Sequence, residues 1–390
     1  MVTKEKLSVN DIRNRNRFNI ISTILAKEGI TRQELARENH ISPMTVKHIA
    51  DELVLEDIVT EQVREVSYGR KPMELRISSW LGTIVCVNVT SPELITYVIY
   101  NLSAEELVRE EILRKNRSYH EMLDETIKKI HAWQQNAMKE IVGIGIFTPG
   151  AYDSEKDLVN YDLIGEFSEI RFREVFENAF RLTNIQVVHD TYSAANAEYA
   201  DMNPEESQYY LYLGVGVGGA FIYSGTTVLG ENHVAGDAGK IRMFNSISGQ
   251  YEFVEDIAST VALTDKIKKV MPEKSLEEVL DAFNNNNLQA SEILLPVLDC
   301  LTVLIGNICW MYNPTRIVID SHCREYANVI KTYASKKVPS LMSDIPHIGI
   351  RLETARHNEY QTMNRCMQMV RELWIQEISS GSYEKQGVKK

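Results

Sequence analysis

Three stretches of the sequence carry residue types that can bind a small polar ligand. His189 and Asp190 end an apolar run, and α/β folds place ligands at the carboxyl ends of such strands. The stretch 214–219, GVGVGG, is dense enough in Gly for its backbone N–H groups to approach a phosphate, or simply to form a tight hairpin. The stretch 230–240, GENHVAGDAGK, follows, with Glu255 downstream. Nothing in the sequence suggests a Ser-His-Asp or Cys-His nucleophile.

A second candidate site lies near the N-terminus, where residues 30–53 have the pattern of a helix-turn-helix, ITRQELARENHISPMTVKHIADEL. Thr31 and Ser42 are good N-caps for two short helices, and Pro43 suits the first position of the second helix. Apolar residues recur at helical spacing on one face of that helix, at Val46, Ile49, Ala50 and Leu53. The alternative interpretation is an ordinary helical hairpin in a larger domain.

The opposite face of the second helix begins with short or basic side chains, and a helix-turn-helix presents this part to base edges in the major groove. A helix at 11–27 and a strand at 73–77 complete three helices and a two-stranded hairpin, which together form a winged helix. Its basic loop at 67–72 would be the wing, which could reach phosphates or a narrow minor groove. We therefore expect DNA contacts from Arg32, Ser42, Pro43, Met44, Thr45, Lys47, His48, Arg70 and Lys71.

The charge distribution is compatible with a DNA-binding segment at the N-terminus. The whole chain has a net charge of −12, which by itself argues against nucleic acid. Residues 1–80, however, contain 13 Lys and Arg against 12 Asp and Glu, and the positive charges cluster, for example at Arg13, Arg15 and Arg17. An acidic body behind a locally basic module would confine DNA contacts to that module.

Length and composition indicate a soluble globular protein of two or three domains. The chain has 390 residues, which exceeds one typical core, and 44% of them are hydrophobic. We expect no membrane span, because no apolar run approaches the ~20 residues that a span needs. The N-terminus shows no apolar signal core. The five cysteines are scattered without a CxxC pair, which favours reduced thiols in a cytoplasmic protein over disulfides or a zinc site.

Beyond residue 80, strand and helix patterns alternate as in α/β folds. The expected strands are 83–89, 93–100, 106–112, 141–147, 185–189, 316–320 and 347–352, with further strands between 208 and 229. The expected helices are 119–137, 171–181, 193–202, 290–312 and 358–377. We place a winged helix-turn-helix domain at 1–80, a first α/β lobe at 81–200, a second lobe at 201–378 and a disordered polar tail at 379–390. The closing helix at about 358–377 can pack on the first lobe.

In this order, behind a winged helix, the motifs resemble those of the ROK family, which comprises sugar kinases and repressors built from the same kinase-like fold plus a DNA-binding head. The family pattern SRxELAxxTGLSxxTV is present as TRQELARENHISPMTV, and the wing pattern GGRxP as YGRKP. The resemblance implies an N-terminal winged helix-turn-helix followed by a two-lobed, actin/hexokinase-like α/β domain. Its second lobe would serve effector binding and dimerisation.

The body departs from the family pattern where the kinases hold ATP and where family members usually hold zinc. The Asp-x-Gly-Gly-Thr turn for phosphate and Mg²⁺ is replaced by VNVTS at 87–91, and the Leu-Gly-Gly turn near adenosine by IDS at 319–321. The zinc-binding positions hold GDAGK at 236–240 and GQYE at 249–252, and a Lys without thiolates cannot make a zinc site. We expect no metal, no cofactor and no kinase activity.

The resemblance also implies which side chains form a sugar site. The Asn-Asp pair that binds sugar hydroxyls in the family, and whose Asp is the base in its kinases, corresponds to His189 and Asp190. The Glu and His of its Gly-rich stretch correspond to Asp237 and Lys240, and a further Glu corresponds to Glu255. The three acids could bind polyol hydroxyls. Lys240 could pair with them and close the pocket, or bind an anion such as a sugar phosphate.

These features together predict a cytoplasmic transcriptional repressor, of carbohydrate-related genes, that binds a double-stranded DNA operator as a homodimer or homotetramer. Its degenerate kinase domain would sense a sugar or sugar phosphate and favour one spacing of the DNA-binding heads. Two alternatives stay open. One is an active ATP-dependent sugar kinase with an accessory head, to which Asp190 and the loop at 214–219 point. The other is a regulator that needs no ligand, with a relic pocket.

Overall fold

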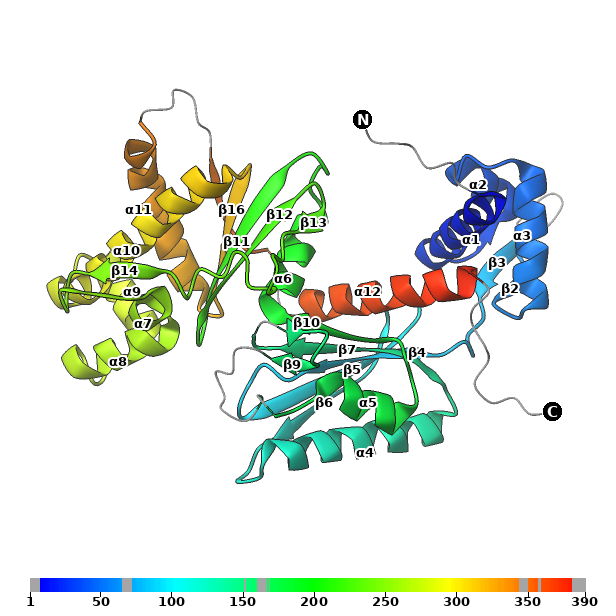
Figure 1. Ribbon diagram of the computed structural model, residues 1–390, viewed down its shortest axis with the longest axis horizontal. Helices are drawn as coiled ribbons and strands as arrows, with labels where there is room; N and C mark the ends of the chain where they lie inside the picture. Colours follow the sequence, from blue (N-terminus) through cyan, green and yellow to red (C-terminus); the bar gives the residue numbers. More distant parts are fainter. Residues whose placement is uncertain are drawn as a thin grey trace. The chain divides into compact units, whose positions relative to one another are not determined.

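The computed structural model describes residues 8–64, 72–150, 152–159, 167, 169–343, 350–356 and 359–380. The chain forms two compact units (Figure 1). The first comprises residues within 1–148, 169–187 and 366–390, and the second comprises residues within 149–168 and 188–365. The three-domain limits of the sequence analysis remain a prediction, and the structure groups the N-terminal head with the first α/β sheet in one unit.

The N-terminal part of the first unit is a winged helix. Its elements are α1 (Val9–Ala26), β1 (Ile30–Thr31), α2 (Arg32–Glu38), α3 (Pro43–Leu55), β2 (Val59–Val63) and β3 (Met73–Ile77). A capping box starts α2, because the Thr31 hydroxyl accepts the N–H of Glu34 at 3.3 Å and the Glu34 carboxylate accepts the N–H of Thr31 at 2.7 Å. The predicted winged helix is confirmed, with one addition: β1 pairs with β3, which extends the expected hairpin to a sheet of order β1-β3-β2.

The apolar face predicted for α3 is buried in the core of this head. Val46, Ile49, Ala50 and Leu53 are at most 4% exposed. Ile21 and Ile24 of α1 and Leu35 of α2 are fully buried as well. Burial of this face directs the other face of α3 to solvent, where the predicted DNA-contacting side chains lie.

The first unit also contains a five-stranded sheet of order β10-β7-β4-β5-β6. Its strands are β4 (Thr83–Asn88), β5 (Leu94–Asn101), β6 (Glu106–Leu113), β7 (Ile141–Thr148) and β10 (Ile185–His189), all close to the predicted limits. Figure 1 shows α4 (Tyr119–Ala137) and α5 (Phe172–Phe180) on one face of this sheet and α12 (Glu359–Ser379) on the other. Two glycines of β7 let α12 approach closely, because a Cβ on Gly143 would lie 2.3 Å from Val370 and one on Gly145 would lie 2.4 Å from Cys366.

The second unit is built on a sheet of order β13-β12-β11-β16-β17. Its strands are β11 (Ser207–Leu213), β12 (Val217–Tyr223), β13 (Thr226–Thr227), β16 (Arg316–Asp320) and β17 (Arg351–Thr354). Side chains of Leu211, Ile317 and Ile319 point to one face, where they pack with α10 (Leu288–Tyr312) and α11 (Arg324–Leu341). Tyr210 and Val318 point to the other face, where α6 (Asp190–Tyr199) covers them. The predicted α/β architecture of this part is confirmed.

Smaller elements complete the second unit. They are the helices α7 (Val254–Ala258), α8 (Thr260–Val270) and α9 (Leu276–Asn284), and the hairpins β8 (Tyr152–Asp153) with β9 (Leu158–Val159) and β14 (Arg242–Asn245) with β15 (Gln250–Phe253). Two predicted limits differ from the structure. Helix α6 begins at Asp190 rather than at 193, and α12 continues to Ser379. Most of the strand predicted at 347–352 and most of the tail lie outside the described residues.

Helix α10 corrects the expectation that no apolar run approaches the length of a membrane span. It is long and apolar enough to cross a membrane, since residues 293–312 contain Asp299 as their one charged side chain. Its most apolar window is nevertheless 67% buried inside the second unit. We therefore interpret α10 as a core helix, which is apolar because most of its circumference is buried.

Candidate DNA-binding surface and effector site

The start of α3 presents the predicted DNA-contacting side chains to solvent. The Ser42 hydroxyl caps the helix by accepting the N–H of Thr45 at 3.1 Å, and Pro43 occupies the first helical position. Ser42, Pro43, Met44, Lys47 and His48 are exposed, and Thr45 is half-buried against the Ser42 hydroxyl. The Lys47 cation, the His48 imidazole and the flexible Met44 side chain are therefore exposed where a helix-turn-helix contacts base edges, whereas the Ser42 hydroxyl is engaged in the cap.

Arg32, also predicted to contact DNA, already has partners within the head. Its guanidinium forms ion pairs with Asp51 of α3 at 2.5 Å and with Glu61 of β2 at 2.6 Å. These pairs tie the N-terminus of α2 to its two neighbours, which the sequence pattern did not indicate. The DNA-binding role of Arg32 stays a prediction. Arg70 and Lys71 of the predicted wing lie outside the described residues.

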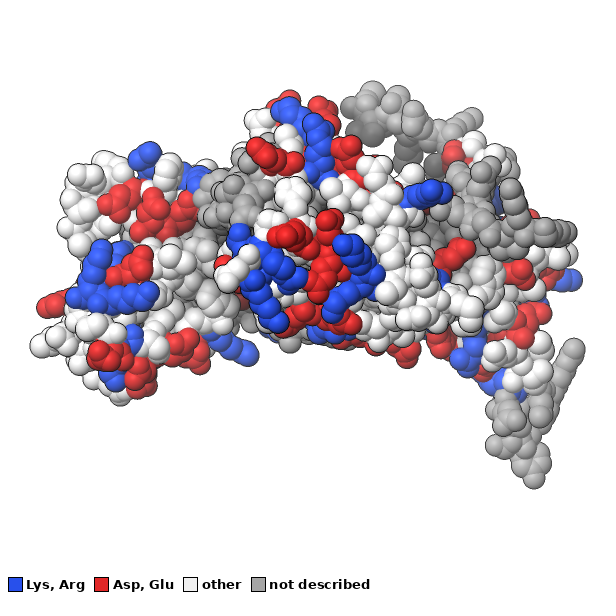
Figure 2. All heavy atoms as spheres, turned by 90° about the horizontal axis from the view of Figure 1, so that it is seen from below, with Lys and Arg blue, Asp and Glu red and all other residues white. Residues whose placement is uncertain are grey.

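Charges of both signs are mixed on the face of the molecule that Figure 2 draws. Figure 2 shows acidic and basic side chains interspersed over the face that it draws, without an extended basic area among the residues described there. This face therefore offers a polyanion no extended area of positive charge among its described residues. Within the head, the exposed start of α3 is the clearest group of predicted DNA-contacting side chains.

The expectation that Arg17 belongs to a cluster of positive charges available to DNA is wrong. Its side chain is 5% exposed. The guanidinium donates to both carboxylate oxygens of Glu56, at 3.1 and 2.5 Å, and to the backbone carbonyl of Ile378 at 3.3 Å. Arg17 therefore joins α1 to the end of α3 and to the last turn of α12. No local sequence signal could have identified partners 39 and 361 residues away.

The candidate effector site begins where β10 ends and α6 begins. Asp190 Oδ1 accepts the N–H of Thr191 at 2.6 Å and its hydroxyl at 3.2 Å, whereas Oδ2 has no hydrogen bond to the described residues. His189 Nε2 lies 3.7 Å from Asp190 Oδ1, and its buried Nδ1 has no partner there either. The His189 ring contacts the Tyr192 ring edge-on, with centroids 4.8 Å apart. An acceptor and an imidazole nitrogen are thus available to a polar ligand.

The loop 230–240 is held against β12 and α6. The Tyr192 hydroxyl donates to the carbonyl of His233 at 2.9 Å, and the Tyr209 hydroxyl donates to the carbonyl of Gly236 at 2.5 Å. A Cβ on Gly219 would lie 2.2 Å from the Gly236 carbonyl oxygen, so only Gly lets the loop approach this strand. The stretch 214–219 forms a tight hairpin that joins β11 to β12, and the approach of its backbone N–H groups to a phosphate stays a prediction.

Asp237, Lys240 and Glu255 meet at the far end of this loop. Lys240 Nζ forms an ion pair with Glu255, and the N–H of Glu255 donates to the Gly239 carbonyl at 3.2 Å. Asp237 accepts the N–H of Gly239 at 3.1 Å. Burial raises the pKa of the Asp237 carboxyl, which the Gly239 N–H and the nearby His189 and Lys240 partly oppose. His189, Lys240 and Glu255 therefore lie close enough to Asp237 to act on its charge, and Asp190 lies beside His189. Lys240 pairs with an acid, one of the expected outcomes.

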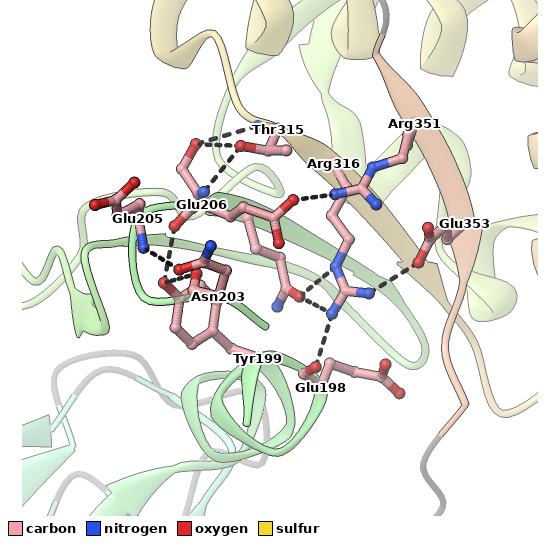
Figure 3. A network of polar contacts seen from close by, with 11 residues as sticks. Glu198, Tyr199, Asn203, Glu205, Glu206, Thr315, Arg316, Arg351 and Glu353 are labelled. Atoms are coloured by element: carbon pink, nitrogen blue, oxygen red, sulfur yellow. Dashed lines mark hydrogen bonds and ion pairs between the residues drawn. The ribbon is translucent and has the colours of Figure 1, made fainter. Parts of the chain in front are cut away.

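A buried ionic network holds the other end of α6. Figure 3 shows the Arg316 guanidinium at its centre. It donates to the Gln208 side chain at 2.7 Å, to the carbonyl of Glu198 at 2.7 Å and to the Glu353 carboxylate at 2.9 Å. The Glu198 carboxylate in turn accepts the N–H of Arg356 at 2.6 Å. Because α6 is fixed to three strands at this end, the position of Asp190 at its other end is well defined.

The described residues give no metal site and no disulfide. No group of three or more His, Cys, Asp or Glu among them is arranged to hold a metal ion, and all five cysteines are buried and outside any disulfide. At the two positions where the family kinases hold ATP, the side chains have local partners. Asn88 accepts the N–H of Thr90 at 3.0 Å, and Asp320 accepts a hydrogen bond from the Tyr210 hydroxyl.

Two sequence patterns of known protein families match this chain. The sequence pattern of the ROK family matches residues 89–371, and that of winged helix-turn-helix DNA-binding proteins matches residues 13–60. The xylose repressor of Caldicellulosiruptor bescii is 20% identical over 91% of this chain and 95% of its own. The xylose repressor of Staphylococcus xylosus is 24% identical over 80% of this chain and 83% of its own.

Solved structures share the fold. A ROK family transcriptional regulator, described as a homologue of the E. coli MLC protein, superposes with a TM-score of 0.74 at 19% identity and covers 95% of this chain and 100% of its own. A ROK hexokinase from Thermus thermophilus superposes with a TM-score of 0.59 at 16% identity, over 73% of this chain and 96% of its own. The regulator is matched through the head as well as the body, whereas the kinase covers less of this chain.

The burial of Arg17 generates a first prediction. The change Arg17→Met keeps the aliphatic volume but leaves Glu56 and the Ile378 carbonyl without their donor. We expect it to lower the free energy of unfolding by about 2 kcal/mol in urea titrations followed by circular dichroism. Arg15 is exposed, so Arg15→Met is the matched control and should stay within about 0.5 kcal/mol of the wild type. Equal effects of the two changes would contradict the assigned role of Arg17.

Proposed function

The chain belongs to the ROK family, and on that premise we propose that it is a cytoplasmic transcriptional repressor controlled by a neutral sugar. The observation that carries the proposal is the pairing of a complete winged helix, with the start of α3 exposed, and a kinase-like body without the phosphate-binding turns. Two relatives aligned over most of their length are named xylose repressors, which supports the same assignment.

DNA recognition would use α3 as the helix in the major groove. Its exposed N-terminal residues have the place and chemistry that a helix-turn-helix uses for base contacts. Since one such head reads only a half-site, we propose that a symmetric dimer binds a two-fold operator. The sugar would control this binding by having different affinities for the operator-bound and free conformations.

The charges at the candidate effector site favour a neutral ligand over a sugar phosphate. The one Lys predicted there, Lys240, is paired with Glu255. Asp190 and Asp237 remain, and an anion beside two carboxylates would be repelled at short range. Hydroxyl groups, by contrast, can donate to Asp190 Oδ2 and exchange a hydrogen bond with His189 Nδ1. We therefore propose an uncharged polyol, such as a monosaccharide, as the effector.

An active sugar kinase with an accessory head is the second candidate, and Asp190 with its free oxygen is the observation that favours it. Phosphoryl transfer depends on positioned contacts to phosphate and Mg²⁺. The stretches at 87–91 and 319–321 lack the residues with which the family kinases make those contacts. The repressor assignment is therefore preferred, and ATP-dependent phosphorylation of a hexose by the purified chain would reverse that preference.

DNA binding provides a direct test of the head. Against a duplex enriched from a random-sequence library by the full chain, Lys47→Ala should weaken binding by about 1–3 kcal/mol if it reads a base. If Lys47 contacts a phosphate instead, the slope of log affinity against log salt should fall by about 1. Fluorescence anisotropy over a salt series distinguishes the two.

The matched control is Lys128→Ala, which removes the same charge from an exposed position on α4. Its affinity and salt slope should equal those of the wild type. If the library yields no enriched sequence, or if the two lysine changes behave alike, the proposed DNA-binding surface is wrong.

Sugar binding tests the body independently of DNA. In a thermal-shift screen, one neutral monosaccharide at ~100 times its dissociation constant should stabilise the native state by ~2.7 kcal/mol, whereas its 6-phosphate and ATP with Mg²⁺ should not. Asp190→Asn should abolish the shift, and Asp201→Asn, at an exposed position, should preserve it. A shift with the phosphate alone would contradict the charge argument.

We expect Asp237 to lower the stability of the fold while it contributes to sugar binding, as is common for residues of functional sites. Because burial raises the pKa of this carboxyl, its ionised form destabilises the fold at pH 7. Asp237→Asn keeps an acceptor for the Gly239 N–H and should raise Tm at pH 7 while weakening the sugar response. The Tm advantage should shrink as the pH falls toward the pKa of Asp237, where the wild-type carboxyl becomes neutral too. A lower Tm for the variant at pH 7 would contradict this account.

A further inference from the structure

Two of the five cysteines meet inside the first unit, between the five-stranded sheet and α12. Cys86 lies on the central strand β4, where it pairs with Gly145 of β7, and Cys366 lies on α12. Both side chains are fully buried, and they form a hydrogen bond to each other. A Cβ on Gly145 would meet the Cys366 sulfur and would lie 3.7 Å from the Cys86 sulfur, so the glycine makes room for the pair. The two thiols therefore face each other across the contact between helix and sheet.

This pair differs from the remaining cysteines of the chain. Cys300, Cys309 and Cys323 belong to the core of the second unit, whereas Cys86 and Cys366 are the two cysteines of the first. A single buried cysteine usually serves as a small apolar side chain. Here the hydrogen bond shows that two thiol side chains point toward each other, which disulfide formation requires.

The packed helix protects the pair from oxidants. The thiolate is the form that reacts, and burial together with the hydrogen bond to Cys366 raises the pKa of the Cys86 thiol. An oxidant in solution cannot reach a fully buried sulfur either. The pair can therefore react only when α12 lifts from the sheet, and native proteins undergo local openings of this kind. The reactivity of the two thiols thus depends on how firmly α12 is packed.

We propose that Cys86 and Cys366 form a reversible disulfide that fastens α12 to the sheet under oxidising conditions, with a hydroperoxide as the oxidant. While α12 is lifted, one thiolate attacks the O–O bond of hydrogen peroxide, which leaves a sulfenic acid on the sulfur and releases hydroxide. When α12 packs again, the partner thiol displaces the sulfenic hydroxyl as water, and the S–S bond forms. Two thiols thereby lose two electrons and two protons, and one peroxide becomes two waters. A small dithiol reverses the bond by exchange.

The bond would act on the helix that holds the DNA-binding head. The last turn of α12 accepts the hydrogen bond from Arg17 at 3.3 Å, and Cys366 lies on the same helix. A covalent link to β4 would fix this support in place, whereas packing alone leaves it free to open. In a reducing cytoplasm such bonds are typically transient and redox-sensing. The inference stands on the positions of the two thiols and holds whether or not the chain binds DNA.

Peptide mapping of the oxidised full chain tests the bond directly. After treatment with hydrogen peroxide and alkylation of the remaining thiols, a non-reducing digest of the wild type should contain two peptides joined through Cys86 and Cys366, and dithiothreitol should separate them. Cys86→Ala and Cys366→Ala should each abolish this species, whereas Cys309→Ala, in the core of the second unit, is the matched control and should retain it. If both cysteines of the treated wild type stay unjoined, whether as thiols or as singly oxidised acids, the proposal is overturned.

Stability and hydrogen exchange supply a second readout, which asks whether the bond fastens α12. Because the link closes a long loop between β4 and α12, oxidation should raise the Tm of the wild type by about 5 °C or more. Amide hydrogen exchange in α12 should slow at the same time. Neither change should occur in Cys86→Ala treated in the same way. A joined wild type with unchanged Tm and unchanged exchange would contradict the fastening of α12.

Discussion

The buried guanidinium of Arg17 is the interaction on which the arrangement of the first unit depends. A charge with 5% exposure is costly to bury unless it has partners, and here its two terminal nitrogens donate to Glu56 and to the Ile378 carbonyl, whereas its buried Nε has no partner among the described residues. The acceptors of the Arg17 guanidinium come from the end of α3 and from the last turn of α12. The same helix packs on the two glycines of β7. The DNA-binding head is therefore attached to the α/β sheet by a helix fitted at both points, and not only by the chain that follows β3.

A second constraint acts on the effector site. Asp190 stands at the first turn of α6, and the far end of that helix is tied to β11, β16 and β17 through Arg316 and Glu198. Close approach of the loop 230–240 to the Gly-rich strand brings Asp237 to the same place. Gly219 permits this close approach, because any Cβ there would meet the Gly236 carbonyl oxygen. We propose that these acids and the His189 imidazole bind the hydroxyl groups of a neutral ligand rather than an anion.

Much of the fold was predictable from the sequence, because its signals are local. The helix caps at Thr31 and Ser42 lie next to the helices that they predict, and the apolar runs are the predicted strands themselves. The partners of Arg17 and Arg32 were not predictable, since ionic contacts between distant segments leave no local pattern. The strand β1 was missed because two residues carry no periodicity, and α10 was misjudged because a core helix and a membrane span share one composition. For the candidate site, the resemblance identified the residues, whereas the Lys240–Glu255 pair required the structure.

The central claim is that a neutral sugar bound in the body changes the affinity of the head for DNA. The most direct measurement is the affinity of the full chain for its enriched duplex, by anisotropy, in the presence of a panel of monosaccharides and their 6-phosphates. One neutral sugar should change that affinity by about tenfold or more, within the range typical of allosteric coupling, and its phosphate should not. Equal affinities across the whole panel would contradict the claim and leave a DNA-binding protein that needs no such ligand.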